Sequence, residues 1–345
     1  MGYFVNYETM DEILETMREK YRVFAPVLLK KRNRGENKEE VRYSEIRKSR
    51  DIVYDRKSDF SPKMTVYPII QTLLYFTGSE VRESELADDR DIVVMLRACD
   101  INGFARLDNM FLGNGNNPDH YYKRLRDRVK FILMECRESF ETCFCVSMGT
   151  NRAEYDNAVR FTEEGMTFTI GDDALSGYFE GRQETEFTPG FVEENIRKVR
   201  VPDITDRSVI KAINESDFWR QFDEKCIACG GCNTVCPTCS CFDTVDVIYN
   251  ETDTDGERRR SWSSCMLESY TVMAGGHGVR SKHGDNMRFK VMHKMYDYNL
   301  RFGQGHMCVG CGRCDMRCPQ DIHFTEAVNG LADIVDQMKE EGRNE

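Results

Sequence analysis

The order of apolar and polar positions in the first part of the chain predicts one helix, then a loop, then strand structure. Residues 8–20 carry apolar side chains at helical spacing and predict an amphipathic helix. The charged residues 30–40 that follow predict a surface loop. Residues 64–76 are apolar and partly β-branched, and Pro68 restricts them to an edge strand or a break.

Two apolar runs further along predict buried strands. Asp91–Leu96 (DIVVML) and Val129–Glu135 (VKFILME) enclose an amphipathic helical pattern over Ile101–Leu112. A strand, a helix and a strand in this order form a βαβ unit, whose two strands are parallel and joined by a right-handed crossover. Their carboxyl ends meet at one edge of the sheet, so Cys99 and Cys136 are expected at that edge.

The remaining pattern predicts an α+β protein of two domains. Residues 161–170 predict a hairpin, and residues 171–202 are rich in loop signals. With 345 residues, two domains are expected: an α/β domain over 1–215 and a helical, two-cluster ferredoxin-like domain over 216–345.

Charge and hydropathy exclude several classes of function. The net charge is 48 − 59 = −11, which argues against nucleic-acid binding. No stretch is apolar enough for a membrane span, and the first 20 residues do not resemble a signal peptide, so a cytoplasmic protein without membrane insertion is expected. Fifteen cysteines in a reducing compartment indicate metal or redox centres rather than disulfides.

The strongest chemical signal is one cysteine pattern that occurs twice. Both runs have the form C-x2-C-x2-C-x3-C-P, which is typical of bacterial two-cluster ferredoxins. Three closely spaced thiolates can reach three irons of one [4Fe–4S] cube, and glycines allow the backbone to turn closely around it. The runs consist of Cys226, Cys229, Cys232, Cys236 and Pro237, and of Cys308, Cys311, Cys314, Cys318 and Pro319.

In such pairs of runs the fourth cysteine ligates the other cluster. We therefore expect one cluster on Cys226, Cys229, Cys232 and Cys318, and a second on Cys308, Cys311, Cys314 and Cys236. Iron binding should then contribute to the folding of this domain. Two zinc sites are the alternative, but zinc does not require cysteines at these fixed offsets. The C-x3-C-x2-C signature of radical S-adenosylmethionine enzymes is missing.

Seven cysteines lie outside the runs. Cys99, Cys136, Cys143 and Cys145 could hold a third cluster, because Cys143 and Cys145 would point to one face of an extended segment. Four buried thiols are the alternative interpretation. Three further cysteines either pack beside a cluster or contribute a ligand: Cys239, Cys241 and Cys265.

Several elements together resemble a known family. The paired runs combine with a Cys-Pro-Thr-Cys-x-Cys extension at 236–241, RACDIN at 97–102 and CFCVSMGT at 143–150. This set resembles the iron–sulfur electron-transfer subunit of anaerobic sulfite reductase over nearly the whole chain, and similar elements occur in sulfhydrogenase β subunits. The 71 residues between Cys236 and Cys308 favour the helical ferredoxin variant over a compact β-type ferredoxin.

The resemblance implies a non-catalytic electron-transfer subunit of an NADH-dependent, anaerobic sulfite reductase complex. It implies an FAD-containing flavoprotein partner that oxidises NADH, and a sirohaem partner that reduces sulfite to sulfide. The nearest alternative is a β subunit of a sulfhydrogenase-type complex. An alternative of another class is a non-catalytic iron–sulfur sensor or scaffold.

Overall fold

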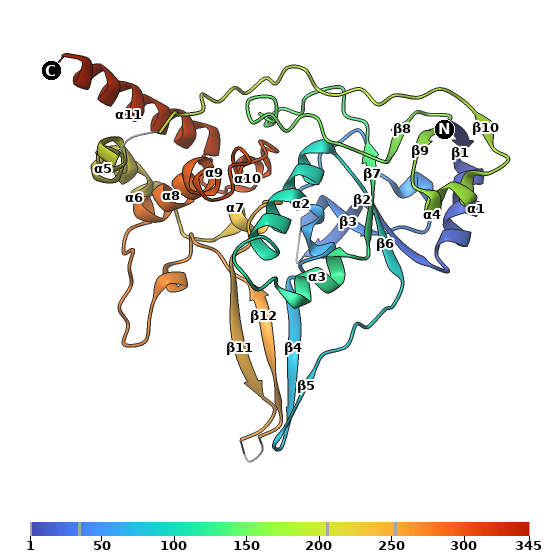
Figure 1. Cartoon of the computed structure of the whole chain (residues 1–345), viewed down its shortest axis with the longest axis horizontal. Helices are drawn as coiled ribbons and strands as arrows, with labels where there is room; N and C mark the ends of the chain where they lie inside the picture. Colours follow the sequence, from blue (N-terminus) through green and yellow to red (C-terminus); the bar gives the residue numbers. More distant parts are fainter. Residues whose placement is uncertain (1, 34–35, 205–206, 252–253, 345) are drawn as a thin grey trace. The chain divides into compact units, whose positions relative to one another are not determined.

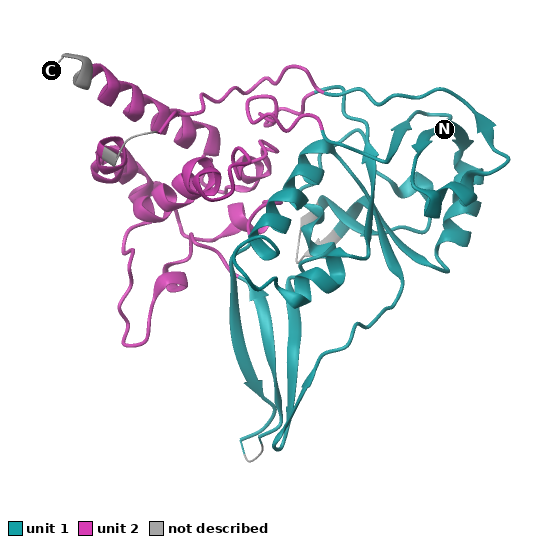
Figure 2. Ribbon diagram, viewed as in Figure 1, with its two compact units in different colours: residues 1–138, 153–191, 240–262 teal, residues 139–152, 192–239, 263–345 magenta. Residues whose placement is uncertain are grey.

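The computed structural model describes residues 2–33, 36–204, 207–251 and 254–344 (Figure 1). Helices and sheets are both present, so the predicted α+β class is confirmed. The chain divides into two compact units, which Figure 2 shows in teal and magenta. Unit 1 comprises Met1–Glu138, Ala153–Phe191 and Ser240–Trp262; unit 2 comprises Ser139–Arg152, Val192–Cys239 and Ser263–Glu345. Each expected domain, 1–215 or 216–345, is one continuous stretch of the chain, whereas each of these units consists of three separate stretches.

Unit 1 is built on an eight-stranded mixed sheet in the order β10-β1-β9-β8-β7-β6-β2-β3. The pairs β2–β6, β6–β7 and β7–β8 are parallel, and the outer pairs are antiparallel. The strands are β1 (Gly2–Asn6), β2 (Tyr21–Asn33), β3 (Glu36–Glu45), β6 (Asp91–Leu96), β7 (Val129–Met134), β8 (Asn157–Phe161), β9 (Gly165–Ile170) and β10 (Gln183–Glu184).

The two faces of this sheet carry separate apolar cores. On one face, Val93 and Met95 of β6 pack with α1 (Tyr7–Met17). On the other, Val94 and Leu96 pack with α2 (Ala98–Phe111) and α3 (His120–Arg126). Successive side chains of a strand point to opposite faces, so β6 is buried on both sides and forms a continuous apolar run. A further short helix is α4 (Asp173–Ser176).

A second, antiparallel sheet in unit 1 joins segments that are far apart in the sequence. Its order is β11-β12-β4-β5, and its strands are β11 (Phe242–Ile248), β12 (Gly256–Trp262), β4 (Ile70–Thr77) and β5 (Glu80–Glu83). The hairpin β11–β12 comes from the long insertion between the two cysteine runs and pairs through β12 with β4. This pairing explains why 240–262 belongs to unit 1 although its neighbours belong to unit 2.

Most predicted elements of unit 1 are confirmed. The helix near 8–20, the βαβ unit and the hairpin near 161–170 all form. The loop predicted at 30–40 is wrong, because the described residues there belong to β2 and β3, which pair antiparallel and place Lys30 opposite Glu39. β3 lies at the edge of the sheet, where charged side chains discourage pairing with another chain.

Unit 2 is helical, in agreement with the expected helical type of ferredoxin domain. None of its described residues belongs to a named strand. Its helices are α5 (Arg207–Glu215), α6 (Gln221–Lys225), α7 (Gly231–Thr234), α8 (His283–Met292), α9 (Tyr298–Phe302), α10 (Arg313–Arg317) and α11 (Phe324–Asn344), with a π-helical turn η6 (His293–Asp297) continuing α8. Across the described part of the chain, no helix is long and apolar enough to cross a membrane.

Candidate iron–sulfur site

The two cysteine runs adopt the same backbone conformation at corresponding positions. Ala228 and Gly310, each before the second cysteine of its run, have positive φ angles of 51° and 59°. Gly230 and Gly312, each after that cysteine, have φ angles of 69° and 67° and begin α7 and α10. Left-handed residues turn the chain tightly and let amide groups face a common centre. The sequence repeat is therefore also a structural repeat.

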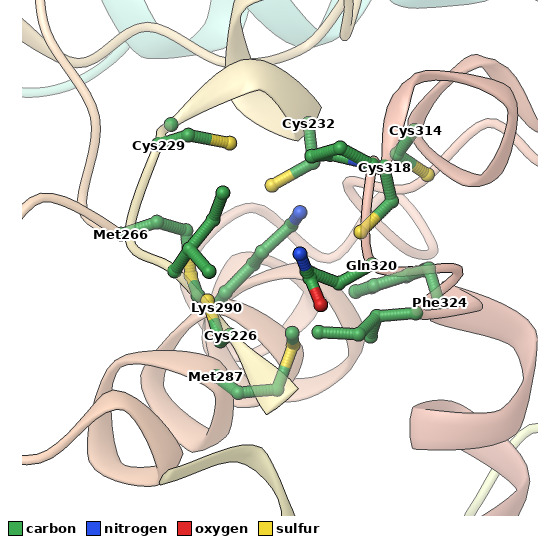
Figure 3. A pocket seen from close by; sticks show the side chains of 14 residues that line it. Cys226, Cys229, Cys232, Met266, Met287, Lys290, Cys314, Cys318, Gln320 and Phe324 are labelled. Carbon is green, nitrogen blue, oxygen red and sulfur yellow. The ribbon is translucent and has the colours of Figure 1, made fainter. Parts of the chain in front are cut away.

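Five cysteines from both runs line one pocket in unit 2 (Figure 3). Cys226, Cys229 and Cys232 belong to the first run, and Cys314 and Cys318 are the third and fourth cysteines of the second. The thiols of Cys229, Cys232 and Cys318 also lie close enough to raise the pKa of Cys226, although burial of Cys226 is the larger cause. The apolar side chains of Met266, Met287, Ile322 and Phe324 line the same pocket.

The other four run cysteines form a second group. Burial raises the pKa of Cys308 to about 12, and the thiols of Cys236 and Cys311 contribute to this shift. The pKa of Cys314 is also raised, first by burial and in part by Cys311 and Cys308. The fourth cysteine of the first run, Cys236, thus lies with the first three of the second run. The fourth cysteine of each run therefore lies near cysteines of the other run.

Backbone amides of both runs face the sulfurs. The amide of Gly310 donates to Cys308 Sγ at 3.5 Å, and the corresponding amide of Ala228 donates to Cys226, which lowers the pKa of that thiol against the larger effect of burial. Hydrogen bonds to thiolate sulfur are among the features that set the potential of an iron–sulfur cluster.

Two buried lysines, Lys290 and Lys294, reach into this region, and the sequence analysis did not identify them. Lys294 Nζ donates to Thr238 Oγ1 at 2.9 Å and lies 3.5 Å from Cys236 Sγ. Figure 3 shows the side chain of Lys290 extending from its helix toward the cysteine sulfurs. The available signal was their spacing of four residues among apolar positions, which puts both on the buried face of one helix.

The segment Ser139–Arg152 packs against the second run. The amide of Phe144 donates to the carbonyl of Gly310 at 2.8 Å, and Thr150 Oγ1 donates to the carbonyl of Val309 at 2.7 Å. Cys143 Sγ lies 3.8 Å from the carbonyl oxygen of Cys311. The second run is therefore covered by a segment that precedes it by more than 150 residues, and Cys308 and Cys311 are buried.

The four residues of the expected third cluster divide between the units. Cys99 lies in the first turn of α2 and Cys136 follows β7, both in unit 1 at the carboxyl ends of adjacent parallel strands. Cys143 and Cys145 are buried in unit 2. Cys143 closes a turn by donating to Phe140, and Cys145 opens the next turn by accepting from Met148.

The last three cysteines differ in their surroundings. Cys239 and Cys265 are buried in unit 2, and Cys265 Sγ accepts a hydrogen bond from Asn233 Nδ2 at 3.1 Å. Cys241 lies in unit 1, where its carbonyl accepts from the hydroxyl of Tyr67 at 3.0 Å. Asn233 directly follows Cys232, so Cys265 lies next to the first group of run cysteines.

The donor chemistry fits iron–sulfur clusters. Each group of four consists of soft sulfur donors in a largely apolar, partly enclosed setting. A single zinc ion needs its thiolates within about 2.3 Å of one point. Among the residues described, no three His, Cys, Asp or Glu side chains converge in that way. Two loops that each carry three thiolates at the fixed C-x2-C-x2-C spacing suit a cubane cluster.

Comparison with known proteins agrees with this chemistry. Residues 225–322, which contain both cysteine runs, match the family model of the 4Fe-4S dicluster domain. Together with the grouped cysteines, this match defines the class of protein: an iron–sulfur electron-transfer protein.

One relative is similar to this chain over nearly the whole length of both proteins. The chain is 27% identical over 348 residues to sulfhydrogenase 2 subunit beta of Pyrococcus furiosus, and the alignment covers 96% of this chain and 97% of the relative. No solved structure matches the chain significantly.

Proposed function

We propose that this chain is the electron-relay subunit of a multi-subunit oxidoreductase and binds two [4Fe–4S] clusters. The grouping of the eight run cysteines, with their fourth members exchanged, carries the proposal. Cys226, Cys229, Cys232 and Cys318 would hold the first cluster, and Cys308, Cys311, Cys314 and Cys236 the second. Such clusters supply one-electron redox chemistry when bound. The chain's own residues hold them, shield them from water and direct amides and charges toward them.

The partners are proposed from similarity. The matched relative is named as a subunit, which supports a complex with other chains. An FAD flavoprotein that oxidises NADH would deliver two electrons together, and this chain would pass them on singly. We place the complex in the cytoplasm, because fifteen cysteines in one chain indicate metal centres rather than disulfides where a reducing compartment keeps thiols reduced.

Two terminal acceptors have specific support. The Cys-Pro-Thr-Cys-x-Cys extension, with the RACDIN and CFCVSMGT elements, favours a sirohaem protein that reduces sulfite. Full-length similarity to a sulfhydrogenase β subunit favours a hydrogenase-type acceptor at least as strongly. Purification of the native complex decides between them: sirohaem absorbance with sulfide production supports the first, and hydrogen uptake or evolution supports the second.

Anaerobic quantification of iron and acid-labile sulfide tests the cofactor content. Two clusters correspond to about eight irons and eight sulfides per chain. A value of about twelve irons that falls to about eight in both Cys99→Ser and Cys143→Ser would support a third cluster on the Cys99, Cys136, Cys143 and Cys145 set. Zinc without sulfide would overturn the proposal.

Replacement of one ligand tests the relay. Cys311→Ser in the assembled complex should abolish electron flow from NADH to the terminal acceptor and leave NADH oxidation with artificial acceptors intact. Thr16→Ala, at an exposed position of α1 in unit 1 that belongs to no candidate ligand set, is the control and should leave electron flow unchanged. Normal electron flow in Cys311→Ser would contradict the proposal and favour a sensor or scaffold.

A further inference from the structure

Two lysines in unit 2 are buried to an extent that is unusual for this residue. The exposed fractions of Lys290 and Lys294 are 3% and 4%. They stand four residues apart where α8 continues into η6, so their side chains leave the same face of one continuous helical segment. A lysine is almost never fully buried unless a group of opposite charge or a strong acceptor compensates it.

Cysteine sulfurs lie near both ammonium ions. Lys290 lines the pocket to which Cys226, Cys229 and Cys232 of the first run and Cys314 and Cys318 of the second contribute. Lys294 Nζ lies 3.5 Å from Cys236 Sγ of the first run.

Carboxylates do not provide the compensation. Among the residues described, the side-chain partners of the two lysines are a sulfur, a hydroxyl and an aromatic ring rather than Asp or Glu. Lys294 Nζ has Thr238 Oγ1 and Cys236 Sγ as its partners, and Lys290 Nζ lies 5.3 Å from the centre of the Phe324 ring. A buried cation without a counter-ion would be costly, so negative charge is required at the sulfurs themselves.

A cluster ligated by four thiolates supplies such charge. Its reduction adds one more negative charge in a region from which water is largely excluded. A fixed positive charge nearby stabilises the reduced form more than the oxidised form, because net charge around the cluster is one of the factors that set its potential.

We propose that Lys290 and Lys294 are the counter-ions of the two clusters and set their reduction potentials. Lys290 acts mainly on the cluster of Cys226, Cys229, Cys232 and Cys318, whose pocket it lines. Lys294 acts mainly on the other cluster, through its contact with Cys236. This inference rests on the proposed function, since it requires both clusters. The lysines act through their positive charge and do not themselves accept electrons.

The test is an anaerobic redox titration of the full chain, followed by electron paramagnetic resonance, on Lys290→Met and Lys294→Met. Methionine retains much of the apolar stem and removes the charge. Each variant should shift the ratio of reduced to oxidised cluster at least tenfold toward the oxidised form, which is about 59 mV lower for one electron. The larger shift should occur at the cluster nearer to the altered lysine.

Lys282→Met is the matched control, because Lys282 is exposed at the start of the same helix, and its midpoints should remain those of the wild type. Lys290→Arg and Lys294→Arg retain the charge and should retain the potentials. Unchanged midpoint potentials in both methionine variants, at full iron content, would overturn this inference and would leave the proposed function intact.

Iron content separates the remaining outcomes. Iron lost from the methionine variants but kept in the arginine variants would support the counter-ion role, because only the charge distinguishes them. Iron lost from both kinds of variant would overturn it and leave only a packing role. Wild-type chain without iron and sulfide would instead refute the proposed function.

Discussion

Gly312 offers a direct test of how closely the segment Ser139–Arg152 covers the second cysteine run. A Cβ atom at this position would lie 2.0 Å from the backbone oxygen of Thr142, and the φ angle is +67°. Gly312→Ala therefore adds two unfavourable effects: left-handed strain and a clash with backbone that cannot rotate away. Gly303 is the matched control, since its φ is +64° and nothing lies within 4 Å of its Cβ position.

The expected loss of stability in each variant follows from these two effects. A non-glycine residue in the left-handed region costs roughly 1–2 kcal/mol, and both variants incur this cost. Overpacking of a closely packed site adds roughly 1–3 kcal/mol, and only Gly312→Ala incurs it. The two variants should therefore differ by about 1–3 kcal/mol, which corresponds to roughly a 5- to 150-fold ratio in an equilibrium or rate constant.

The assay is the rate of cluster loss in urea, because a protein with tightly bound metal does not unfold in a simple two-state equilibrium. Visible absorbance under anaerobic conditions reports the loss. Gly312→Ala should bleach at least about 5 times faster than Gly303→Ala, by the ratio above. Gly310→Ala should behave like Gly312→Ala, because its Cβ would lie 2.6 Å from the backbone nitrogen of Cys145. Equal bleaching of Gly303→Ala and Gly312→Ala, at equal iron content, would refute the packing argument.

Three further predictions concern acid stability, the core of unit 2 and the order of cluster loss. Burial would raise the pKa of Asp172, but hydrogen bonds, chiefly from Lys130, hold this pKa below its ordinary value. Ionised Asp172 therefore stabilises the folded state above about pH 4, and this contribution is lost as the pH falls below that value. Asp172→Asn should therefore lower the urea midpoint at neutral pH, measured by circular dichroism, and reduce its decline in acid. Trp219→Ala removes the largest fully buried side chain among the described residues and leaves a cavity in unit 2, so its thermal midpoint should lie below that of the wild type. Because Cys229 is exposed and Cys308 is buried, a chelator should remove the first cluster before the second, and simultaneous loss in electron paramagnetic resonance spectra would contradict this.

The elements predicted correctly have local causes. The strands β6 and β7 are continuous apolar runs because both faces of the sheet are covered, and the helix between them has an apolar stripe. The cysteine runs have a fixed spacing, and their left-handed positions are occupied mostly by glycine, so the backbone repeat could be predicted from the sequence. In each case, neighbouring residues contain the whole signal.

The elements that were missed depend on residues distant in the sequence. The polar strands β2 and β3 pair antiparallel with each other, and a charge count along the chain cannot distinguish such a pair from a loop. The pairing of β12 with β4 joins residues about 185 apart, as Thr72 Oγ1 and Glu257 illustrate at 2.6 Å. Lys290 and Lys294 appeared in the sequence as ordinary polar positions, because the sulfurs that compensate them come from other segments.

The two runs also show why a repeat in sequence does not imply equivalent sites. Their backbones match, yet Cys229 is exposed while its counterpart Cys311 is buried. The difference arises from the segment Ser139–Arg152, which donates hydrogen bonds to the carbonyls of Val309 and Gly310. Solvent exposure and hydrogen bonding both change the potential of a cluster. Two clusters on nearly identical loops would therefore differ in potential.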